Sequence, residues 1–101
     1  MPSNRPRIYK KKIADFCRRW KIREFALFGS IVRDDFSAKS DVDVLVTFAL
    51  DCGWGLYDLM DMQDELKTMF GRKVDLVEKE GLRNPFRRKA ILNEARVIYA
   101  A

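Results

Sequence analysis

The sequence predicts a small single-domain α/β protein of the α+β type, in which helices and short strands alternate along the chain. Its 101 residues have room for one hydrophobic core. Hydrophobic residues make up 48% of the chain and charged residues 35%, which is typical of a folded globular protein and too apolar for a disordered one. The spacing of the apolar residues then distinguishes helices from strands.

The first half of the chain is expected to form one helix and two strands. Apolar side chains recur at helical spacing over residues 8–20, with basic side chains between them, which predicts an amphipathic helix. A short apolar run at 25–28 predicts a buried strand, and Gly29-Ser30 directly after it predicts a tight turn. The β-branched run at 42–48 predicts a second strand.

The second half is expected to form two helices and two strands. Apolar residues at helical spacing over 56–70, followed by Gly71, predict a long helix that ends in a left-handed glycine. A loop at 51–55 precedes it. The later elements are a strand at 73–78, a basic helix from Asn84-Pro85 to about residue 95 and a strand at 97–99.

The composition excludes several kinds of chemistry. The chain has no histidine, so imidazole-activated nucleophiles and histidine metal sites are absent. Its two cysteines, Cys17 and Cys52, form no CxxC pair, which argues against a zinc site or a disulfide scaffold and favours a cytoplasmic location. The apolar run at 42–50 is too short to span a membrane, and the basic start MPSNRPRIYKKK lacks the apolar core of a signal peptide.

Charge is segregated along the chain, which carries a net charge of +5. Residues 1–24 hold nine basic and two acidic residues, residues 25–82 hold six basic and twelve acidic, and residues 83–101 hold five basic and one acidic. An acidic centre with basic flanks suits a carboxylate metal site that attracts a polyanion. Solvated helix faces would give the same distribution, so the charges alone leave both interpretations open.

Asp41 and Asp43 form the most informative motif. They are two residues apart at the start of a predicted strand, so both carboxylates project from one face. Their repulsion favours a bound cation, and oxygen ligands of this kind suit Mg²⁺ or Mn²⁺. Asp75, in the apolar strand at 73–78, would lie beside the pair if the two strands are neighbours. Three carboxylates can hold two divalent ions.

Gly29, Ser30 and Arg33 form a candidate phosphate-binding turn. Glycine lets the backbone approach a phosphate, serine adds a hydroxyl and an amide donor, and Arg33 can add a charged fork to the same anion. Taken singly, a GS turn, a DxD pair and a strand aspartate are each more often a turn, a cap and a salt-bridge partner. Their succession as strand, GS, DxD strand, helix and Asp strand is much rarer by chance.

In this order the residues resemble the minimal nucleotidyltransferases (MNT) of the DNA polymerase beta superfamily. The signature of that family is Gly-Ser, ten residues and Asp-x-Asp, which matches Gly29-Ser30 and Asp41-Val42-Asp43. The similarity continues through the 56–70 helix, GRKVDLV at 71–77 and LRNPFRRKAIL at 82–92. It implies one nucleotidyltransferase domain over 1–101, with a basic helix at 8–20, a catalytic core at 23–80, and a basic helix and strand at 84–99.

The resemblance also implies a short mixed sheet with helices packed mainly on one side, and a role for each residue of the site. Asp41 and Asp43 would bind the metal ions. Asp75 would complete the second metal site and help to deprotonate the attacking hydroxyl. Ser30 and the amide after Gly29 would hold the β and γ phosphates of ATP, with support from Arg33. The hydroxyl would attack the α-phosphate and pyrophosphate would leave.

Two other features of the sequence are open to a structural or a functional interpretation. Asp34 and Asp35, between the two motifs, suit a salt bridge or turn cap better than metal binding. Trp54 lies in a glycine-rich loop, where it would either cover a nucleotide base or pack beneath the loop.

The resemblance further suggests a partner, because minimal nucleotidyltransferases are commonly paired with a HEPN ribonuclease toxin. Transfer of AMP to a tyrosine of the toxin would make this chain an antitoxin within a hetero-oligomer. The alternative is a non-catalytic antitoxin that masks its partner by direct contact. Direct nucleic-acid binding by the basic N-terminal helix and Arg83–Lys89 is not expected, because these charges lack interleaved aromatic residues on one face.

Overall fold

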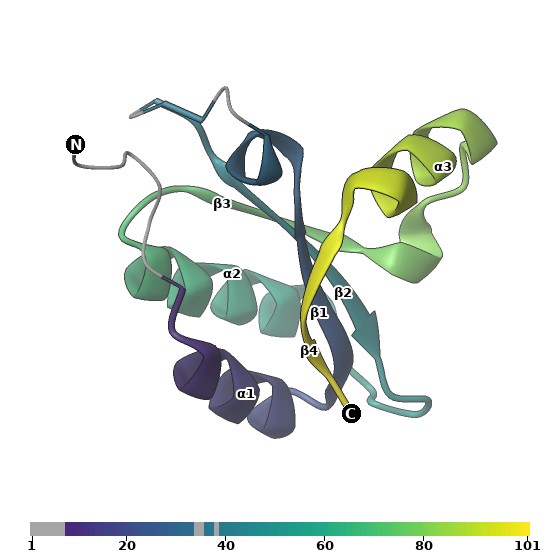
Figure 1. Cartoon of the computed structure of the whole chain (residues 1–101). Helices are drawn as coiled ribbons and strands as arrows, with labels where there is room; N and C mark the ends of the chain where they lie inside the picture. The colour runs from purple at the N-terminus through teal and green to yellow at the C-terminus, as the bar shows by residue number, and fades with distance from the viewer. Residues whose placement is uncertain (1–7, 34–35, 38) are drawn as a thin grey trace.

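Four strands and three α-helices make up the described part of the chain, which comprises residues 8–33, 36–37 and 39–101 of this computed structural model (Figure 1). Two short 3₁₀ turns, η1 and η2, follow β1 and β3. The elements in chain order are α1 (Lys10–Arg19), β1 (Ile22–Phe28), η1 (Gly29–Val32), β2 (Val42–Phe48), α2 (Leu56–Phe70), β3 (Val74–Glu78), η2 (Lys79–Gly81), α3 (Pro85–Glu94) and β4 (Arg96–Ala100).

The strands form one mixed sheet in the order β3-β2-β1-β4. β1 runs antiparallel to both of its neighbours, β2 and β4, whereas β3 runs parallel to β2. A parallel pair needs a crossover connection, and α2 provides it between β2 and β3. The expected α+β fold with a short mixed sheet is confirmed.

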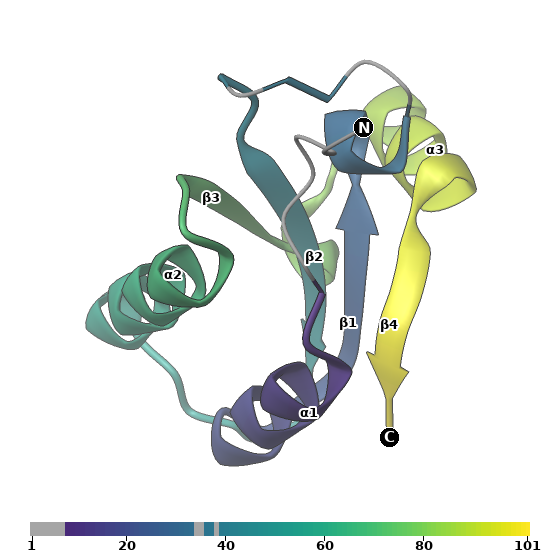
Figure 2. The same ribbon diagram turned by 60° about the vertical axis from the view of Figure 1, so that its left-hand side comes forward.

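Different helices cover the two faces of the sheet (Figure 2). α1 and α2 lie on one face and enclose the main core, to which Val42, Val44 and Val46 of β2 contribute fully buried side chains. α3 lies on the other face, where Ile91 joins a smaller cluster with Leu45 of β2. Because side chains alternate along a strand, Asp43 shares the α3 face with Leu45.

Local sequence signals set the ends of two helices. Gly71 adopts φ +71° directly after α2, as expected for a left-handed glycine that ends a helix. At the start of α3, Asn84 Oδ1 accepts hydrogen bonds from the amides of Phe86 and Arg87, at 3.0 and 3.2 Å. The bounds of α2, and Asn84 as the cap of α3, agree with the sequence prediction.

β1 begins at Ile22, three residues before the apolar run that predicted it. Arg23 is exposed, so the first residues of β1 do not form a continuous apolar run. The register with β2 is also irregular between Ile22 and Glu24. Backbone pairing with Phe48 and neighbouring residues, rather than side-chain pattern, extends the strand. α1 is shorter than the predicted helix at 8–20, starting at Lys10 and ending at Arg19.

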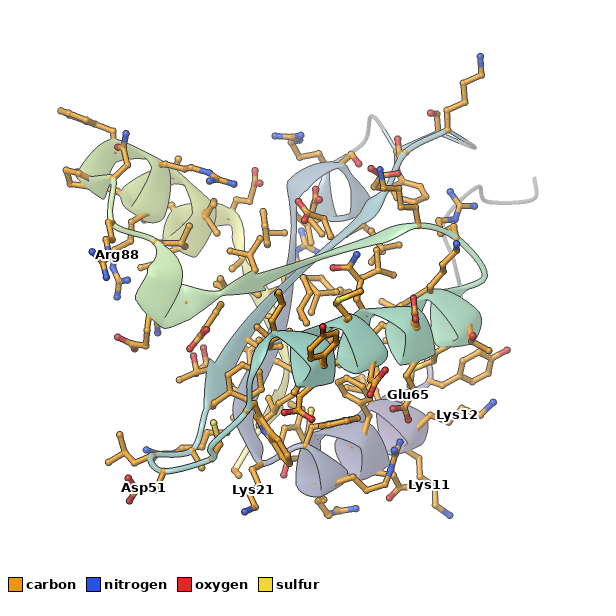
Figure 3. All side chains as sticks on the ribbon, turned by 180° about the vertical axis from the view of Figure 1, so that it is seen from behind. Lys11, Lys12, Lys21, Asp51, Glu65 and Arg88 are labelled. Atoms are coloured by element: carbon orange, nitrogen blue, oxygen red, sulfur yellow. The ribbon has the colours of Figure 1, made fainter. Side chains whose placement is uncertain are left out.

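Trp54 packs beneath the loop that precedes α2. Its indole Nε1 donates a hydrogen bond to the Trp20 carbonyl oxygen at 2.6 Å, and the two rings meet edge to face with centroids 5.1 Å apart. Trp20 Nε1 in turn donates to Glu65, whose side chain lies between α2 and α1 (Figure 3). Trp54 is therefore part of the packing that joins α1 to α2.

Neither cysteine is part of a disulfide. Cys17 and Cys52 are free thiols, and burial in the main core raises the pKa of Cys17 to about 12, with the charge of Arg18 opposing the shift. A thiol with so high a pKa stays protonated and unreactive at neutral pH. Among the described residues, no helix has the length and apolar character needed to cross a bilayer.

Candidate functional site

The turn after β1 is held against the carboxylate of Asp43. Gly29 has φ +76°, a conformation that favours glycine, and a Cβ placed on it would overlap Asp43 Oδ2. Phe28, the residue before the turn, pairs with Asp43 across β1 and β2. Glycine is therefore required at position 29 for its backbone conformation and for the room it leaves to the carboxylate.

The sheet register places Asp43 directly beside Asp75. The two residues are partners in the parallel β2–β3 ladder, and Asp41 lies just before β2 begins. Asp43 and Asp41 are partly buried and Asp75 is exposed, so the carboxylates lie at an open end of the sheet. The sequence predicted that Asp75 would lie beside Asp41 and Asp43 if the strands at 42–48 and 73–78 were neighbours, and the register shows that these strands pair directly.

These carboxylates influence one another electrostatically. The pKa of Asp43 is raised, first by partial burial, then by the negative charges of Asp75 and Asp41, and by the more weakly felt charge of Glu94. The positive charge of Arg33 opposes the shift. The charged form of Asp43 is thus disfavoured in the metal-free protein, and a cation placed among the carboxylates would relieve the repulsion.

The donor set fits a divalent cation in its chemistry. Carboxylate oxygens are the ligands that Mg²⁺ and Mn²⁺ prefer, and mutual repulsion among them favours a bound positive charge. Within residues 8–33, 36–37 and 39–101, however, no three acidic or cysteine side chains stand together as a ready metal-binding group. Asp41, Asp43 and Asp75 would have to turn their side chains to share an ion.

The predicted phosphate-binding residues follow directly in the turn. Ser30 is half-buried in η1, and its hydroxyl makes no hydrogen bond to another residue in the part of the chain that the structure describes. Arg33, immediately after η1, is exposed and lies beside Glu94, with Nη1 3.4 Å from Glu94 Oε2. Asp34 and Asp35, which follow, lie outside the described residues.

Glu94 also belongs to this site, although it was not among the residues predicted from the sequence. It is the last residue of α3, and its Oε1 accepts a hydrogen bond of 2.7 Å from the Gly29 amide. Figures 1 and 2 show the turn after β1 and the last turn of α3 at the same end of the sheet. One signal could have drawn attention to it, because Glu94 is the single acidic residue of the basic segment 83–101.

The chain is similar in sequence to known proteins. The family described as "Nucleotidyltransferase domain" matches residues 10–98. Protein adenylyltransferase MntA of Thermococcus cleftensis is 34% identical over 91 residues, which cover 90% of this chain and 84% of the relative. A protein of Methanocaldococcus jannaschii, MJ1379, provisionally named a protein adenylyltransferase, is 32% identical over 85 residues, covering 84% of this chain and 82% of the relative.

A solved structure of a provisionally assigned minimal nucleotidyltransferase has a TM-score of 0.70 to this chain and is 32% identical, with 86% of each chain covered. The chain belongs to the minimal nucleotidyltransferases. It is thus a nucleotidyltransferase by family, as its Gly-Ser and Asp-x-Asp motifs predicted.

More distant structures share the fold of this minimal nucleotidyltransferase. A toxin–antitoxin structure with AMP-PNP has a TM-score of 0.75 at 20% identity, covering 93% of this chain and 75% of that one. A tri-AMPylated Shewanella oneidensis HEPN toxin in complex with its MNT antitoxin has a TM-score of 0.66 at 19% identity, covering 91% and 70% of the two chains. At these identities the likeness is one of fold.

Proposed function

We propose that this minimal nucleotidyltransferase transfers AMP from ATP to a tyrosine hydroxyl of a HEPN ribonuclease toxin, and so acts as a cytoplasmic antitoxin in complex with it. The observation that carries the proposal is the register that sets Asp43 beside Asp75 and against Gly29. The relatives lend it support, since one is named a protein adenylyltransferase and a protein of the same fold was solved with an AMPylated HEPN toxin.

The chain's own residues can divide the binding of ATP between them. The Ser30 hydroxyl, the amide after Gly29 and the Arg33 guanidinium would bind the β and γ phosphates, since all three donate hydrogen bonds and Arg33 adds charge. Mg²⁺, bound by Asp41 and Asp43 with Asp75 completing a second position, would neutralise the phosphate charge and polarise the α-phosphate. Orientation and charge neutralisation account for most of the catalysis of phosphoryl-type transfer.

The transfer itself balances without a further reactant. The tyrosine oxygen forms a bond to the α-phosphorus, the bond from that phosphorus to the bridging oxygen of the β-phosphate breaks, and pyrophosphate leaves. An Asp75 carboxylate oxygen takes up the hydroxyl proton. Asp75 suits this role because it is exposed, where an incoming side chain can reach it.

The deciding experiment is the intact mass of a HEPN toxin from the same genome, co-expressed with this chain and purified. Wild-type protein is expected to increase the toxin mass by whole adenylyl units. Asp41→Asn/Asp43→Asn is expected to abolish the increase, because amides bind Mg²⁺ far more weakly than carboxylates do. Asp61→Asn, an exposed change in α2, is the matched control and should leave the modification at the wild-type level.

An unmodified toxin that is still bound and silenced by both the wild type and the double variant would overturn the proposal. That result would identify the alternative function, an antitoxin that masks its partner by contact alone. A mass increase by a different nucleotide unit would support the transferase activity but show that the donor is a nucleoside triphosphate other than ATP.

A further inference from the structure

Glu94 makes two contacts with the turn that carries Gly29 and Arg33. Oε1 accepts the Gly29 amide hydrogen at 2.7 Å, and Oε2 lies 3.4 Å from Arg33 Nη1. The carboxylate therefore bridges the backbone at the start of η1 and the side chain directly after its end. Glu94 is 65 residues from Gly29 in the sequence, so this is a tertiary tether between α3 and the turn rather than a local cap.

The two contacts differ in strength. The Arg33 side chain is 55% exposed, and an ion pair so accessible to water contributes little to stability. The hydrogen bond to the Gly29 amide joins a charged acceptor to a backbone donor at short distance, and the Glu94 side chain is only 28% exposed. Charge-assisted bonds of this kind are the stronger ones, so the Gly29 contact is the important one.

Gly29 needs such an anchor. Its φ of +76° is one of many conformations open to glycine, and no side chain restricts it. The turn must nevertheless hold one conformation, because Gly29 contacts Asp43 and Ser30 follows it directly. Since Glu94 accepts the Gly29 amide hydrogen, a phosphate at this turn would be bound by Ser30 and Arg33 instead.

We propose that Glu94 is a positioning residue for the nucleotide: its carboxylate fixes the Gly29 turn so that Ser30 and Arg33 are preorganised for the triphosphate. The inference rests on the proposed function in taking ATP as the ligand. Preorganisation strengthens binding by removing the entropy cost of ordering the turn when the ligand arrives.

The test compares three substitutions at position 94 by the dissociation constant for Mg·ATP, measured by calorimetry on the purified chain. Glu94→Gln keeps an oxygen at the same reach and should bind within about threefold of the wild type. Glu94→Ala removes the acceptor and should bind about tenfold more weakly, which corresponds to about 1.4 kcal/mol. Glu94→Asp keeps the charge but shortens the side chain, and should resemble Glu94→Ala.

Asn93→Ala, an exposed change one residue earlier on α3, is the control for general damage to the helix and should bind as the wild type does. With the toxin present, Glu94→Ala should raise KM for ATP more than it lowers kcat, because Glu94 does not touch the reacting atoms. Rescue by glutamine but not by aspartate is a pattern that a loss of stability alone would not produce. If Glu94→Ala does not fold, glutamine and aspartate still decide the matter.

Two results would overturn the inference. Equal binding by all variants would show that the turn needs no anchor, and tighter binding by Glu94→Ala would show that Glu94 competes with phosphate. The proposed function can fail separately, because a wild type that binds Mg·ATP without modifying the toxin would refute the transfer while the binding series still tests Glu94.

Discussion

The two faces of the sheet are built for different tasks. The face beneath α1 and α2 is closed by fully buried apolar side chains, among them Phe16, Phe25 and Leu66. The face that carries α3 has a smaller apolar cluster, and at its end lie the partly buried Asp43 and the exposed Asp75, whose charges repel each other. Stability is concentrated on the first face and charged chemistry at the end of the second.

Ionic contacts show the same division. On the first side, Arg19 and the Trp20 indole donate hydrogen bonds to Glu65, and these contacts outweigh the effect of its burial and lower its pKa. On the second side, burial and neighbouring carboxylates raise the pKa of Asp43. The charged form of Glu65 is stabilised, whereas the charged form of Asp43 is destabilised. The fold therefore keeps electrostatic repulsion at the end of the sheet where a bound cation can relieve it.

The largest difference between the two faces is expected in the stability lost when a phenylalanine on each is replaced by alanine. Phe16 is fully buried and meets Phe25 edge to face at 6.3 Å, whereas Phe86 on α3 is 85% exposed. Phe16→Ala should lower the free energy of unfolding by about 3–5 kcal/mol, because it leaves a cavity in the main core. Phe86→Ala should change it by about 0.5 kcal/mol or less. Urea unfolding measures both, and equal losses would contradict the division.

The next largest difference in stability is expected between alanine substitutions at two glycines. Gly29 and Gly53 have nearly the same φ, +76° and +74°, but a Cβ at Gly53 meets nothing within 4 Å. Gly53→Ala should cost about 1 kcal/mol for the backbone conformation alone. Gly29→Ala should cost about 3 kcal/mol, because its methyl group also displaces Asp43. Gly29→Ala should also weaken Mg·ATP binding by at least about tenfold, whereas Gly53→Ala should leave binding unchanged.

The smallest effect is a pH dependence of opposite sign for two acids. The raised pKa of Asp43 means that its stabilising protonation is present below the unfolded pKa, near 3.8, and is lost as pH rises through the folded pKa. The lowered pKa of Glu65 means that its contribution is present above about 4.5 and is lost as pH falls through the folded pKa.

In metal-free protein at pH 7, Asp43→Asn should therefore raise the free energy of unfolding by roughly 0.5 kcal/mol, the scale of interactions between partly exposed charges. Glu65→Gln should lower it by about 1 kcal/mol, because Arg19 and Trp20 lose a charged acceptor. The Asp43→Asn difference should shrink as the pH falls through the raised folded pKa of Asp43 toward 3.8, and the Glu65→Gln difference should shrink as the pH falls below about 4.5. Urea unfolding in EDTA across this range measures them, and shifts of the same sign would refute the contrast.

Much of the fold could be predicted because its signals are local. Gly71 and Asn84 mark helix ends through their own backbone and side-chain chemistry, and the β-branched run gave the bounds of β2. Asp43 and Asp75 could be named as candidates because an aspartate in an apolar strand is unusual. That they are direct partners followed only from the register, which depends on how α2 crosses the sheet.

Other features could not be predicted because they depend on contacts between distant parts of the chain. The first residues of β1 lack an apolar pattern and are held by pairing with β2. Glu94 looked like any polar residue near a helix end, and its role depends on α3 bringing it to Gly29. Sequence spacing revealed the motifs of the site, but not the residue that anchors one of them.

The separation of Gly29 and Glu94 along the chain also has a consequence during synthesis. A growing chain that has emerged as far as Val77 already contains the Gly-Ser turn and all three aspartates, yet it lacks the acceptor for the Gly29 amide. α3 must leave the ribosome before the turn can be held as it is in the finished fold. Nascent chains of this protein therefore complete the candidate site only after α3 has emerged, later than the segment that carries its motifs.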